Sequence, residues 1–322
     1  MKAAVISENG GPEVLRYEEV PDPDCPDGCV VVDAEAISIE GGDVLARATG
    51  QLPAVPHIIG YLSAGTVTEV GAGVVGRAVG DRVVALNTAG SHAARRAVLA
   101  VMTWSIPAGL DAAQAACVPV AFGTAHECLF TAGNLAEGQS VLIHAGAGGV
   151  GMAAIQLAKR AGATVFATAS SDAKLARLTA FGLDHGINYA TGRFVDRINE
   201  LTDSRGVDLV IDSVGGETLV DSVDALAYRG TVVSVGVAAR AGSAIEARSL
   251  WTRNTTLRGV YLGGAILPEY ARIHPMIGDM LARVASGELR VEIDRSFPLA
   301  DAAVAHEYVE SRRAFGRVVI TP

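Results

Sequence analysis

A glycine-rich turn near the middle of the chain is the clearest chemical signal in the sequence. The run from Val141 to Gly151 reads VLIHAGAGGVG, so an apolar strand enters the turn and an apolar helix leaves it. The glycines fit GxGxxG counted from Gly146, and also AxxGxxG counted from Ala145. Such a turn lets a pyrophosphate approach the backbone, and the helix N-terminus offers free N–H groups and a positive dipole end. We therefore expect a dinucleotide site made by Ala145, Gly146, Gly148, Gly149, Val150 and Gly151.

The end of the next apolar strand indicates which dinucleotide binds. NAD sites usually place a carboxylate there, whereas this chain has Ala169 followed by Ser170 and Ser171. Asp172 comes next, but it is expected to cap the following helix. A small neutral pocket rich in hydroxyls, with Lys174 one turn on, suits a 2′-phosphate, so we expect NADPH. The alternative for Lys174 is an ordinary solvated helix lysine.

Alternating strand and helix patterns position this turn. From residue 140 to about residue 260, short apolar runs are separated by helical patterns, which predicts a parallel, doubly wound α/β sheet. The expected strands are Ser140–Ala145, Thr164–Thr168, Gly186–Tyr189, Asp208–Asp212, Thr231–Val235 and Leu257–Val260. Helices are expected over Val150–Ala161 and Asp172–Phe181.

The two ends of the chain have a different texture. The first third is mainly β, and a helix capped by Asp111 follows it. The tail predicts helices over Pro268–Ser286 and Ala300–Ser311 and a closing strand over Gly316–Ile320. The strands expected in the first third are Lys2–Ile6, Cys29–Ile37, Ala64–Val70 and Arg82–Leu86.

Composition and charge narrow the possible functions. The chain has 322 residues, of which 50% are hydrophobic and 19% are charged, which is typical of a folded protein of two domains. Its net charge of −9 argues against nucleic acid as a partner. No apolar run is long enough for a membrane span or a signal peptide, so we expect a cytoplasmic protein. The four cysteines form no CxxC pair and are expected to be free thiols.

Together these motifs resemble the zinc-independent quinone oxidoreductase branch of the medium-chain dehydrogenase/reductase superfamily, which includes zeta-crystallin. The resemblance covers nearly the whole chain. It implies a GroES-like β-barrel substrate domain split over residues 1–120 and 263–322. A Rossmann NADPH-binding domain over residues 121–262 lies between the two parts, with the active site in the cleft, and the family implies a homodimer. The motifs that carry the resemblance are Ala64–Val67, Val79–Val83, His144–Gly151, Val207–Gly216 and Gly316–Val319.

The same resemblance assigns further cofactor contacts. Lys174, Tyr189 and Arg312 match positions that contact the 2′-phosphate and adenosine in the family. The residues that match the lining of the ribose and nicotinamide sites are Thr124, Asp212, Ser213, Val214, Gly236, Tyr261 and Leu262.

Zinc-dependent members of the superfamily have three convergent metal ligands, and this chain departs from them. The first ligand position is Glu40, the second falls on Tyr61 and Leu62, and the third lies near Val118. A catalytic zinc needs three convergent ligands. Glu40 is the one possible donor, so we expect no metal. Many quinone oxidoreductases have Asn at the position of Glu40 and Tyr at the position of Leu45, so the pocket floor differs here.

Three residues are candidates for the substrate side. We expect Glu40, Asp43 and Tyr61 to line it, with the Tyr61 phenol donating a hydrogen bond to a substrate carbonyl or enolate. The alternative for Glu40 and Asp43 is a structural role in capping the turn and the helix that follow. The alternative for Tyr61 is a packed tyrosine of the barrel.

The leading hypothesis for function is an NADPH-dependent reductase of quinones or α,β-unsaturated ketones. A conjugated carbonyl is already electrophilic, so hydride transfer to it requires positioning and a donor to the developing enolate rather than a metal. An enoyl-thioester reductase, acting on CoA-bound or carrier-bound substrates, is the nearest alternative. A non-catalytic NADPH-binding protein with a structural or regulatory role is the alternative of another class.

Overall fold

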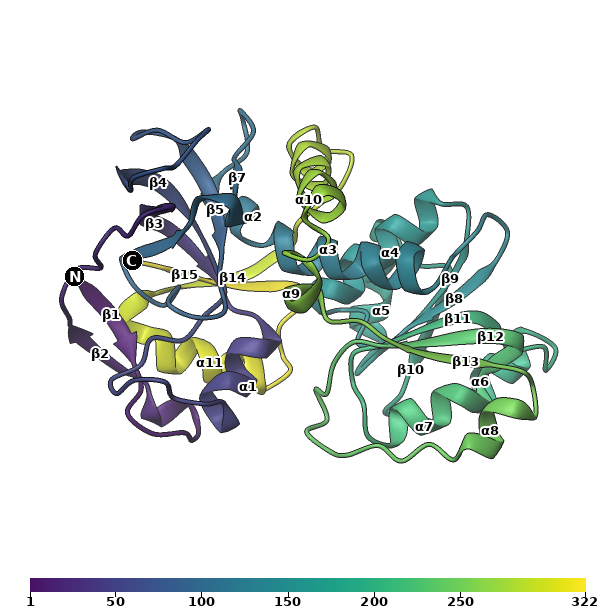
Figure 1. Ribbon diagram of the computed structural model, residues 1–322. Helices are drawn as coiled ribbons and strands as arrows, with labels where there is room; N and C mark the ends of the chain where they lie inside the picture. Colours follow the sequence, from purple (N-terminus) through teal and green to yellow (C-terminus); the bar gives the residue numbers. More distant parts are fainter. The chain divides into compact units, whose positions relative to one another are not determined.

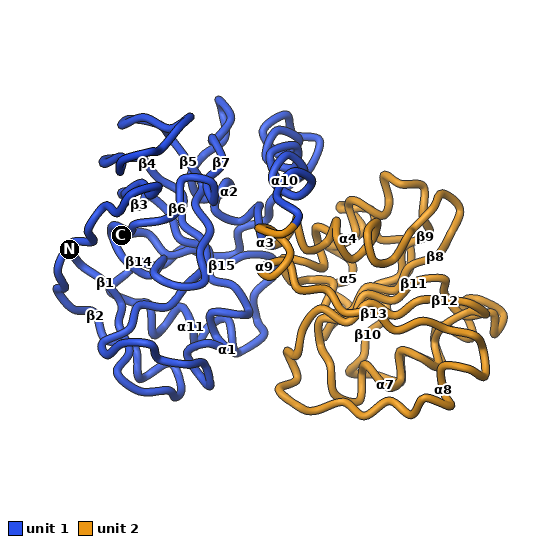
Figure 2. The backbone as a smooth tube through the Cα atoms, viewed as in Figure 1, with its two compact units in different colours: residues 1–120, 269–322 blue, residues 121–268 orange.

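The computed structural model describes all residues from Met1 to Pro322 (Figure 1). The chain forms two compact units (Figure 2). Unit 1 consists of residues 1–120 and 269–322, and unit 2 consists of residues 121–268. The second boundary thus lies after residue 268, whereas the sequence placed it after residue 262. No helix has the length and apolar character needed to cross a membrane.

Unit 2 contains a six-stranded sheet in which all neighbouring strands are parallel. The strand order is β10-β9-β8-β11-β12-β13, which is the order of a Rossmann sheet. This confirms the doubly wound α/β fold predicted from the sequence. The strands are β8 (Ser140–Ile143), β9 (Thr164–Ala169), β10 (His185–Asn188), β11 (Val207–Asp212), β12 (Leu226–Ser234) and β13 (Thr256–Gly259).

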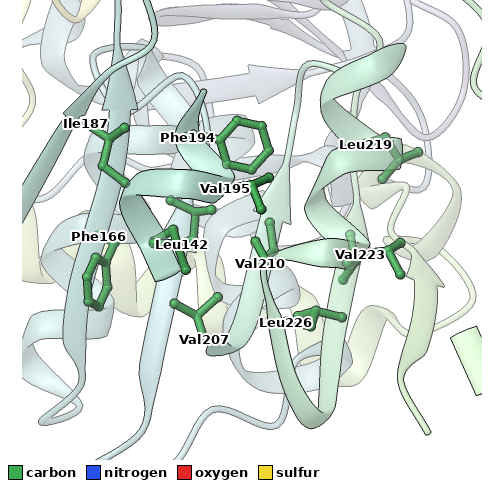
Figure 3. Close-up of a cluster of buried hydrophobic side chains, with 13 residues drawn as sticks. Leu142, Phe166, Ile187, Phe194, Val195, Val207, Val210, Leu219, Val223 and Leu226 are labelled. Atoms are coloured by element: carbon green, nitrogen blue, oxygen red, sulfur yellow. The ribbon is translucent and has the colours of Figure 1, made fainter. Parts of the chain in front are cut away.

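Helices connect these strands and cover the sheet. They are α3 (Val118–His126), which leads into a π-helix over Glu127–Ala132, then α4 (Gly149–Arg160), α5 (Asp172–Leu178), α6 (Phe194–Leu201), α7 (Glu217–Asp224), α8 (Ala247–Trp251) and α9 (Leu262–Ala265). One core cluster packs strand residues such as Leu142 and Val210 against Phe194 of α6 and Val223 of α7 (Figure 3). Full burial of each such side chain contributes about 1.5–3 kcal/mol. This packing fixes the carboxyl ends of the strands along one edge.

Unit 1 is built around the ten-residue strand β3 (Cys29–Ser38). Its larger sheet has the order β14-β15-β3-β4-β5-β7, and β6 also pairs with β3. β1 (Lys2–Val5) and β2 (Arg16–Glu19) form a separate hairpin. The other strands are β4 (Leu62–Val70), β5 (Arg82–Leu86), β6 (Arg95–Leu99), β7 (Thr103–Ser105), β14 (Ile293–Pro298) and β15 (Arg317–Thr321).

Four α-helices complete unit 1, and two of them carry buried polar side chains. The helices are α1 (Gly41–Thr49), α2 (Ala112–Ala116), α10 (Tyr270–Ala285) and α11 (Ala302–Glu310). Asp111 caps α2 as predicted, because its carboxylate accepts the N–H of Gln114 at 2.8 Å. α1 and α11 pack on a core that includes Ile37, Val44 and Ile320. Short 3-10 turns cover Pro12–Val14, Ala100–Met102, Thr179–Phe181 and Leu299–Asp301.

Candidate active site

The glycine turn lies at the carboxyl end of β8, and its main chain forms the candidate site. Ala145 adopts a left-handed conformation with φ of 51°. Gly146 donates its N–H to the carbonyl oxygen of Thr168 on β9 at 2.8 Å. Gly148 donates to the carbonyl oxygen of Ala145 at 2.9 Å, immediately before α4 begins. The turn is thereby fixed to two neighbouring strands.

The three glycines of the motif lack a side chain for different reasons. A Cβ on Gly151 would lie 2.4 Å from the carbonyl oxygen of Ala145, so α4 packs directly on the turn. A Cβ on Gly146 would lie 2.9 Å from the Cβ of Ala167. A Cβ on Gly148 would have one neighbour within 4 Å, the Ala145 carbonyl oxygen at 3.3 Å. A shift of that oxygen by a few tenths of an ångström would make room for the Cβ. Packing therefore requires Gly146 and Gly151, whereas Gly148 leaves space for a ligand.

Helix α4 begins with N–H groups that no side chain of its N-cap can satisfy. The N-cap is Gly148, and Gly149, Val150 and Gly151 form the first turn. First-turn N–H groups have no acceptor within their helix, and the helix dipole adds a partial positive charge there. The main chain of this segment therefore has the donors that a pyrophosphate needs, and these residues fit the phosphates of NADPH.

Two serines follow β9, and one of them caps the next helix. The Ser171 hydroxyl accepts the N–H of Lys174 at 3.3 Å, with Ser171 in an extended conformation. Asp172 is already helical, so the prediction that Asp172 is the cap was wrong. The Asp172 carboxylate instead accepts a hydrogen bond from Asn188 at 3.0 Å. Ala169 and the half-buried Ser170 therefore leave the strand end neutral, which suits a 2′-phosphate.

Asp212 ends β11 as a fully buried carboxylate beside this turn, because β11 pairs with β8. One carboxylate oxygen accepts the N–H groups of Val214 at 2.6 Å and Gly215 at 2.9 Å. Burial raises the pKa of Asp212, and these two hydrogen bonds partly oppose the increase. Asp212 therefore shapes the loop that carries Ser213 and Val214.

The remaining expected cofactor contacts are distributed over both units. In unit 2, Tyr189 donates its N–H to the carbonyl oxygen of Ala169 at 3.2 Å, and a Cβ on Gly236 would lie 2.7 Å from the carbonyl oxygen of Ser213. Arg312 belongs to unit 1, where it follows α11 with φ of 56°. The other expected contacts of unit 2 are the buried Thr124 in α3, the exposed Tyr261 and the buried Leu262 at α9.

In unit 1, Glu40 and Asp43 lie at the start of α1, and both are buried. The Asp43 carboxylate accepts the main-chain N–H of Glu40 at 2.8 Å, which caps the helix. Ser38 donates to one carboxylate oxygen of Glu40 at 3.0 Å, and Arg317 donates to the same oxygen. These contacts favour the structural alternative for Glu40 and Asp43, and their catalytic role stays a prediction.

Arg317 of β15 connects the strand that ends the chain to the start of α1. Its Nη2 also donates to Ser38 at 2.5 Å and to the carbonyl oxygen of Ile39 at 3.0 Å. Burial raises the pKa of Glu40, whereas the charge of Arg317 opposes that increase. Burial together with the charge of Glu40 raises the pKa of Asp43 well above its usual value. The ionised forms of the Glu40 and Asp43 carboxylates therefore depend on the positive charge of Arg317.

Tyr61 is half-buried and lies over the first turn of α1. A Cβ on Gly42 would lie 2.4 Å from the Tyr61 ring and 2.6 Å from its hydroxyl, so any side chain at this position would displace the ring. The Tyr61 carbonyl oxygen accepts hydrogen bonds from Arg96 at 3.0 Å and from the N–H of Asn87 at 3.0 Å. Of the three predicted substrate-side residues, Tyr61 alone is not buried, which suits a donor to a bound molecule.

Comparisons with known proteins agree with this arrangement. Residues 26–127 match the alcohol dehydrogenase GroES-like domain, and residues 149–278 match the zinc-binding dehydrogenase family. A 2-haloacrylate reductase from Burkholderia is 32% identical, over 99% of this chain and 98% of that protein. The Escherichia coli quinone oxidoreductase, solved with NADPH, superposes with a TM-score of 0.94 at 30% identity, over the whole of both chains.

The chain belongs to the quinone oxidoreductase branch of the medium-chain dehydrogenase/reductase superfamily. This confirms the resemblance inferred from the sequence. A highly reducing polyketide synthase from Gibberella zeae is 34% identical over 99% of this chain, although the chain spans only 13% of that synthase.

One matching family is described as zinc-binding. In this quinone oxidoreductase-like chain, however, the one candidate zinc ligand, Glu40, forms hydrogen bonds with other side chains. Glu40 is paired with Arg317 and Ser38, as described above. The structure brings together no group of three or more His, Cys, Asp or Glu side chains that could hold a metal ion. The four cysteines are free thiols. The absence of a catalytic metal stays a prediction, which metal analysis of the purified protein would test.

Sequence reasoning missed four buried residues that lie in the same unit as the three predicted substrate-side residues. Arg317 lies within the motif Gly316–Val319 that carries the family resemblance, but the sequence assigned it no role, and it assigned none to Arg96. Burial lowers the pKa of Arg96 to about 10, although the charge of Asp43 opposes this. His92 and His306 carry no local motif at all, so only the fold could have identified them.

Proposed function

We propose that this protein is an NADPH-dependent reductase that delivers hydride to a quinone or an α,β-unsaturated carbonyl compound without a metal. The observation that carries the proposal is the uncapped start of α4 behind the glycine turn, next to a neutral strand end with two serines. In this proposal unit 2 binds the cofactor and unit 1 supplies the groups that contact the substrate.

The residues of the chain would divide the chemistry between them. NADPH, when bound, supplies the hydride. The first-turn N–H groups of α4 would hold the pyrophosphate, and Ser170, Ser171 and Lys174 would contact the 2′-phosphate. The Tyr61 phenol would donate a hydrogen bond to the oxygen on which negative charge develops. Glu40 and Asp43 would act through the start of α1, on which the Tyr61 ring packs, rather than through contact with substrate.

Enoyl-thioester reduction is a second candidate because of one observation. The polyketide synthase segment that matches this chain covers 99% of it. The chemistry is the same conjugate addition of hydride, so the two candidates differ in the acceptor. A basic entrance for a phosphopantetheine arm would favour the thioester. Arg95 does not offer one, because it is paired with Asp33 at 2.6 Å and Asp22 at 2.8 Å.

The test is NADPH oxidation with a panel of quinones, enones and enoyl-CoA thioesters. We expect turnover with quinones or enones and a much lower kcat/KM with enoyl-CoA. Turnover confined to enoyl-CoA would favour the second candidate, and no turnover with any acceptor would favour a non-catalytic NADPH-binding protein.

Tyr61→Phe tests the assigned donor. We expect kcat with the best acceptor to fall about ten-fold, with NADPH affinity unchanged, because a hydrogen bond made mainly in the transition state is lost. Tyr17→Phe is the matched control, since Tyr17 is an exposed tyrosine on β2 of the same unit. Full kcat in Tyr61→Phe would show that Tyr61 is not the donor and that solvent provides the proton.

We also propose that two copies associate through unit 2, as a homodimer in the cytoplasm. β13 is one of the two edge strands of the sheet, and all its residues are exposed. Nearby exposed aromatic residues include Trp251 and Tyr228, on the segments that flank this edge. An unpaired strand edge with exposed apolar side chains is suited to pairing with a second chain. Light scattering should give a dimer, and Leu257→Lys on β13 should shift it toward monomer.

A further inference from the structure

Four buried side chains form a continuous hydrogen-bonded chain in unit 1, apart from the Glu40–Arg317 pair. Nη1 of Arg47 on α1 lies 3.2 Å from Nδ1 of His306 on α11. Nε2 of His306 lies 2.9 Å from Nε2 of His92. Nδ1 of His92 lies 3.3 Å from the hydroxyl oxygen of Ser91. All four side chains have zero exposure to solvent.

The chemistry of these groups fixes where the protons lie. A guanidinium can only donate hydrogen bonds, so Nδ1 of His306 must be the acceptor, and a neutral His306 carries its proton on Nε2. That proton points at Nε2 of His92, which must therefore be unprotonated. His92 then carries its proton on Nδ1 and donates it to Ser91. Every donor in the chain thus points in one direction, from Arg47 to Ser91.

Both histidines are held neutral by their surroundings. Burial and the nearby Arg96 lower the pKa of His92 to about 3. Burial, His92 and Arg47 lower the pKa of His306 well below its usual value. Glu310 is a further charged group beside Arg47, and it pairs at 2.9 Å with Nη2 of the guanidinium, whereas Nη1 contacts His306. A second proton on His306 would place an N–H directly against the N–H of Arg47.

The Ser91 end of this hydrogen-bonded series contacts the segment that carries Tyr61. Ser91 donates its main-chain N–H to the carbonyl oxygen of Gly60 at 3.1 Å. Gly60 has φ of 103°, and a Cβ there would lie 2.1 Å from both the Ser91 hydroxyl and Nδ1 of His92. These two groups therefore pack against the Cα of Gly60, and no other residue fits. The peptide that follows Gly60 is the start of Tyr61.

We infer that the Arg47–His306–His92–Ser91 chain is a positioning device with a single fixed tautomer at each histidine, which holds Gly60 and so aims Tyr61. The catalytic part of this inference rests on the proposed role of Tyr61 as hydrogen-bond donor. These four hydrogen-bonded side chains do not serve as a proton path to the substrate. Its far end is a guanidinium, which does not release a proton to replace one passed along the chain.

The tautomers can be observed directly, without cofactor or substrate. NMR of protein labelled with 15N in histidine distinguishes protonated from unprotonated ring nitrogens. At pH 7 we expect His306 to be protonated at Nε2 only and His92 at Nδ1 only, with assignments from His92→Phe and His306→Gln. The opposite tautomer at either histidine, or an imidazolium, would overturn the inference.

Kinetics test whether the chain acts through Tyr61. His92→Phe removes both hydrogen bonds of His92, and we expect kcat to fall about five-fold with NADPH affinity unchanged. In the Tyr61→Phe background the same change should have no further effect on kcat. His274→Gln is the control, because His274 is a hydrogen-bonded histidine of unit 1 that contacts Thr103 and Trp104 instead.

The outcomes separate the two ideas. If Tyr61→Phe retains full kcat, the proposed donor role fails, whereas the NMR result still decides whether the fixed chain exists. If Tyr61→Phe is impaired but His92→Phe reduces kcat by the same factor with and without the Tyr61 hydroxyl, the positioning role is wrong. Should His92→Phe fold poorly, the His306→Gln spectrum still assigns His306, and its tautomer in the wild type tests the hydrogen-bonded chain.

Discussion

The candidate sites of the two units differ in which groups form them, main chain in one unit and buried side chains in the other. In unit 2 the site is main chain, supplied by consecutive residues from Ala145 to Gly151 and a helix start without a side-chain cap. In unit 1 the groups around Tyr61 are held by buried side chains distant in sequence, such as Glu40 and Arg317, which are 277 positions apart. A cofactor common to many enzymes can be bound by a local motif. A pocket for a particular acceptor depends on long-range packing, and the following predictions test this contrast.

The largest expected effect is on unit 1. Arg317→Met should reduce the free energy of unfolding by about 3–5 kcal/mol, because it leaves the Glu40 carboxylate buried without its counter-charge. Urea denaturation measures this. The double variant Arg317→Met/Glu40→Leu should recover most of the loss, since neither charge of this pair remains.

Arg82→Met is the control for this change. Arg82 pairs with Glu35 at 3.7 Å, and both side chains are well exposed, so its loss should cost no more than about 1 kcal/mol. Equal costs for Arg317→Met and Arg82→Met would mean that buried charge does not organise unit 1.

In unit 2 two alanine substitutions should separate folding from binding. Gly151→Ala should reduce the free energy of unfolding by about 2–4 kcal/mol, because its Cβ would overlap the main chain of the turn. Gly148→Ala should remain folded but bind NADPH more weakly, on the order of 30-fold or about 2 kcal/mol. Fluorescence titration with NADPH and thermal unfolding report the two effects. Gly192→Ala is the control, since a Cβ there would meet no atom within 4 Å.

The opposite pattern would contradict this division of roles. If Gly148→Ala unfolds the protein and Gly151→Ala only weakens NADPH binding, the packing assigned to these two glycines is wrong.

Acid should destabilise the protein through its buried histidines. His92 in unit 1 and His144 in unit 2 are fully buried, and burial lowers the pKa of each to about 3. An unfolded histidine takes up a proton near pH 6.5. Their contribution is therefore complete above pH 6.5 and declines as the pH falls toward 3, by about 1.4 kcal/mol per pH unit for each histidine.

Comparison with His92→Phe isolates one histidine. The difference in stability between wild type and variant should shrink by about 2 kcal/mol from pH 7 to pH 5, measured by urea denaturation. Taking the difference cancels the opposite contribution of Asp43, whose pKa is raised by burial. A pH-independent difference would show that the pKa of His92 in the folded protein equals that in the unfolded chain.

The elements of the fold that the sequence predicted are those with a local apolar pattern. The expected strands of unit 2 all occur, because most of them are short apolar runs between turn residues. β12 begins at Leu226, whereas the sequence placed its start at Thr231. The exposed pair Tyr228 and Arg229 interrupts the apolar pattern of the strand, which is why its first residues were missed. β2, with the sequence RYEE, was missed because all four of its residues are exposed.

The candidate site divides in the same way. The phosphate turn is contiguous and needs only glycine and helix rules, so its residues could be listed from the sequence. His92 and His306 are 214 positions apart, and nothing in either neighbourhood indicates the other. Ser171 and Asp172 are both good capping residues, and only the backbone conformation decides between them. Long-range pairing and exact helix starts are thus what local patterns leave open.

Cofactor choice offers the smallest and most local test. Ala169 ends β9 and is buried, and Asp172 is tied to Asn188, so the strand end presents no carboxylate of its own. Wild type should prefer NADPH over NADH in kcat/KM. Ala169→Asp should shift that preference about ten-fold toward NADH, because a carboxylate can accept the ribose hydroxyls and repels a 2′-phosphate. Ala167→Ser on the same strand is the control, and an unchanged ratio in Ala169→Asp would move the 2′-phosphate contact away from this strand end.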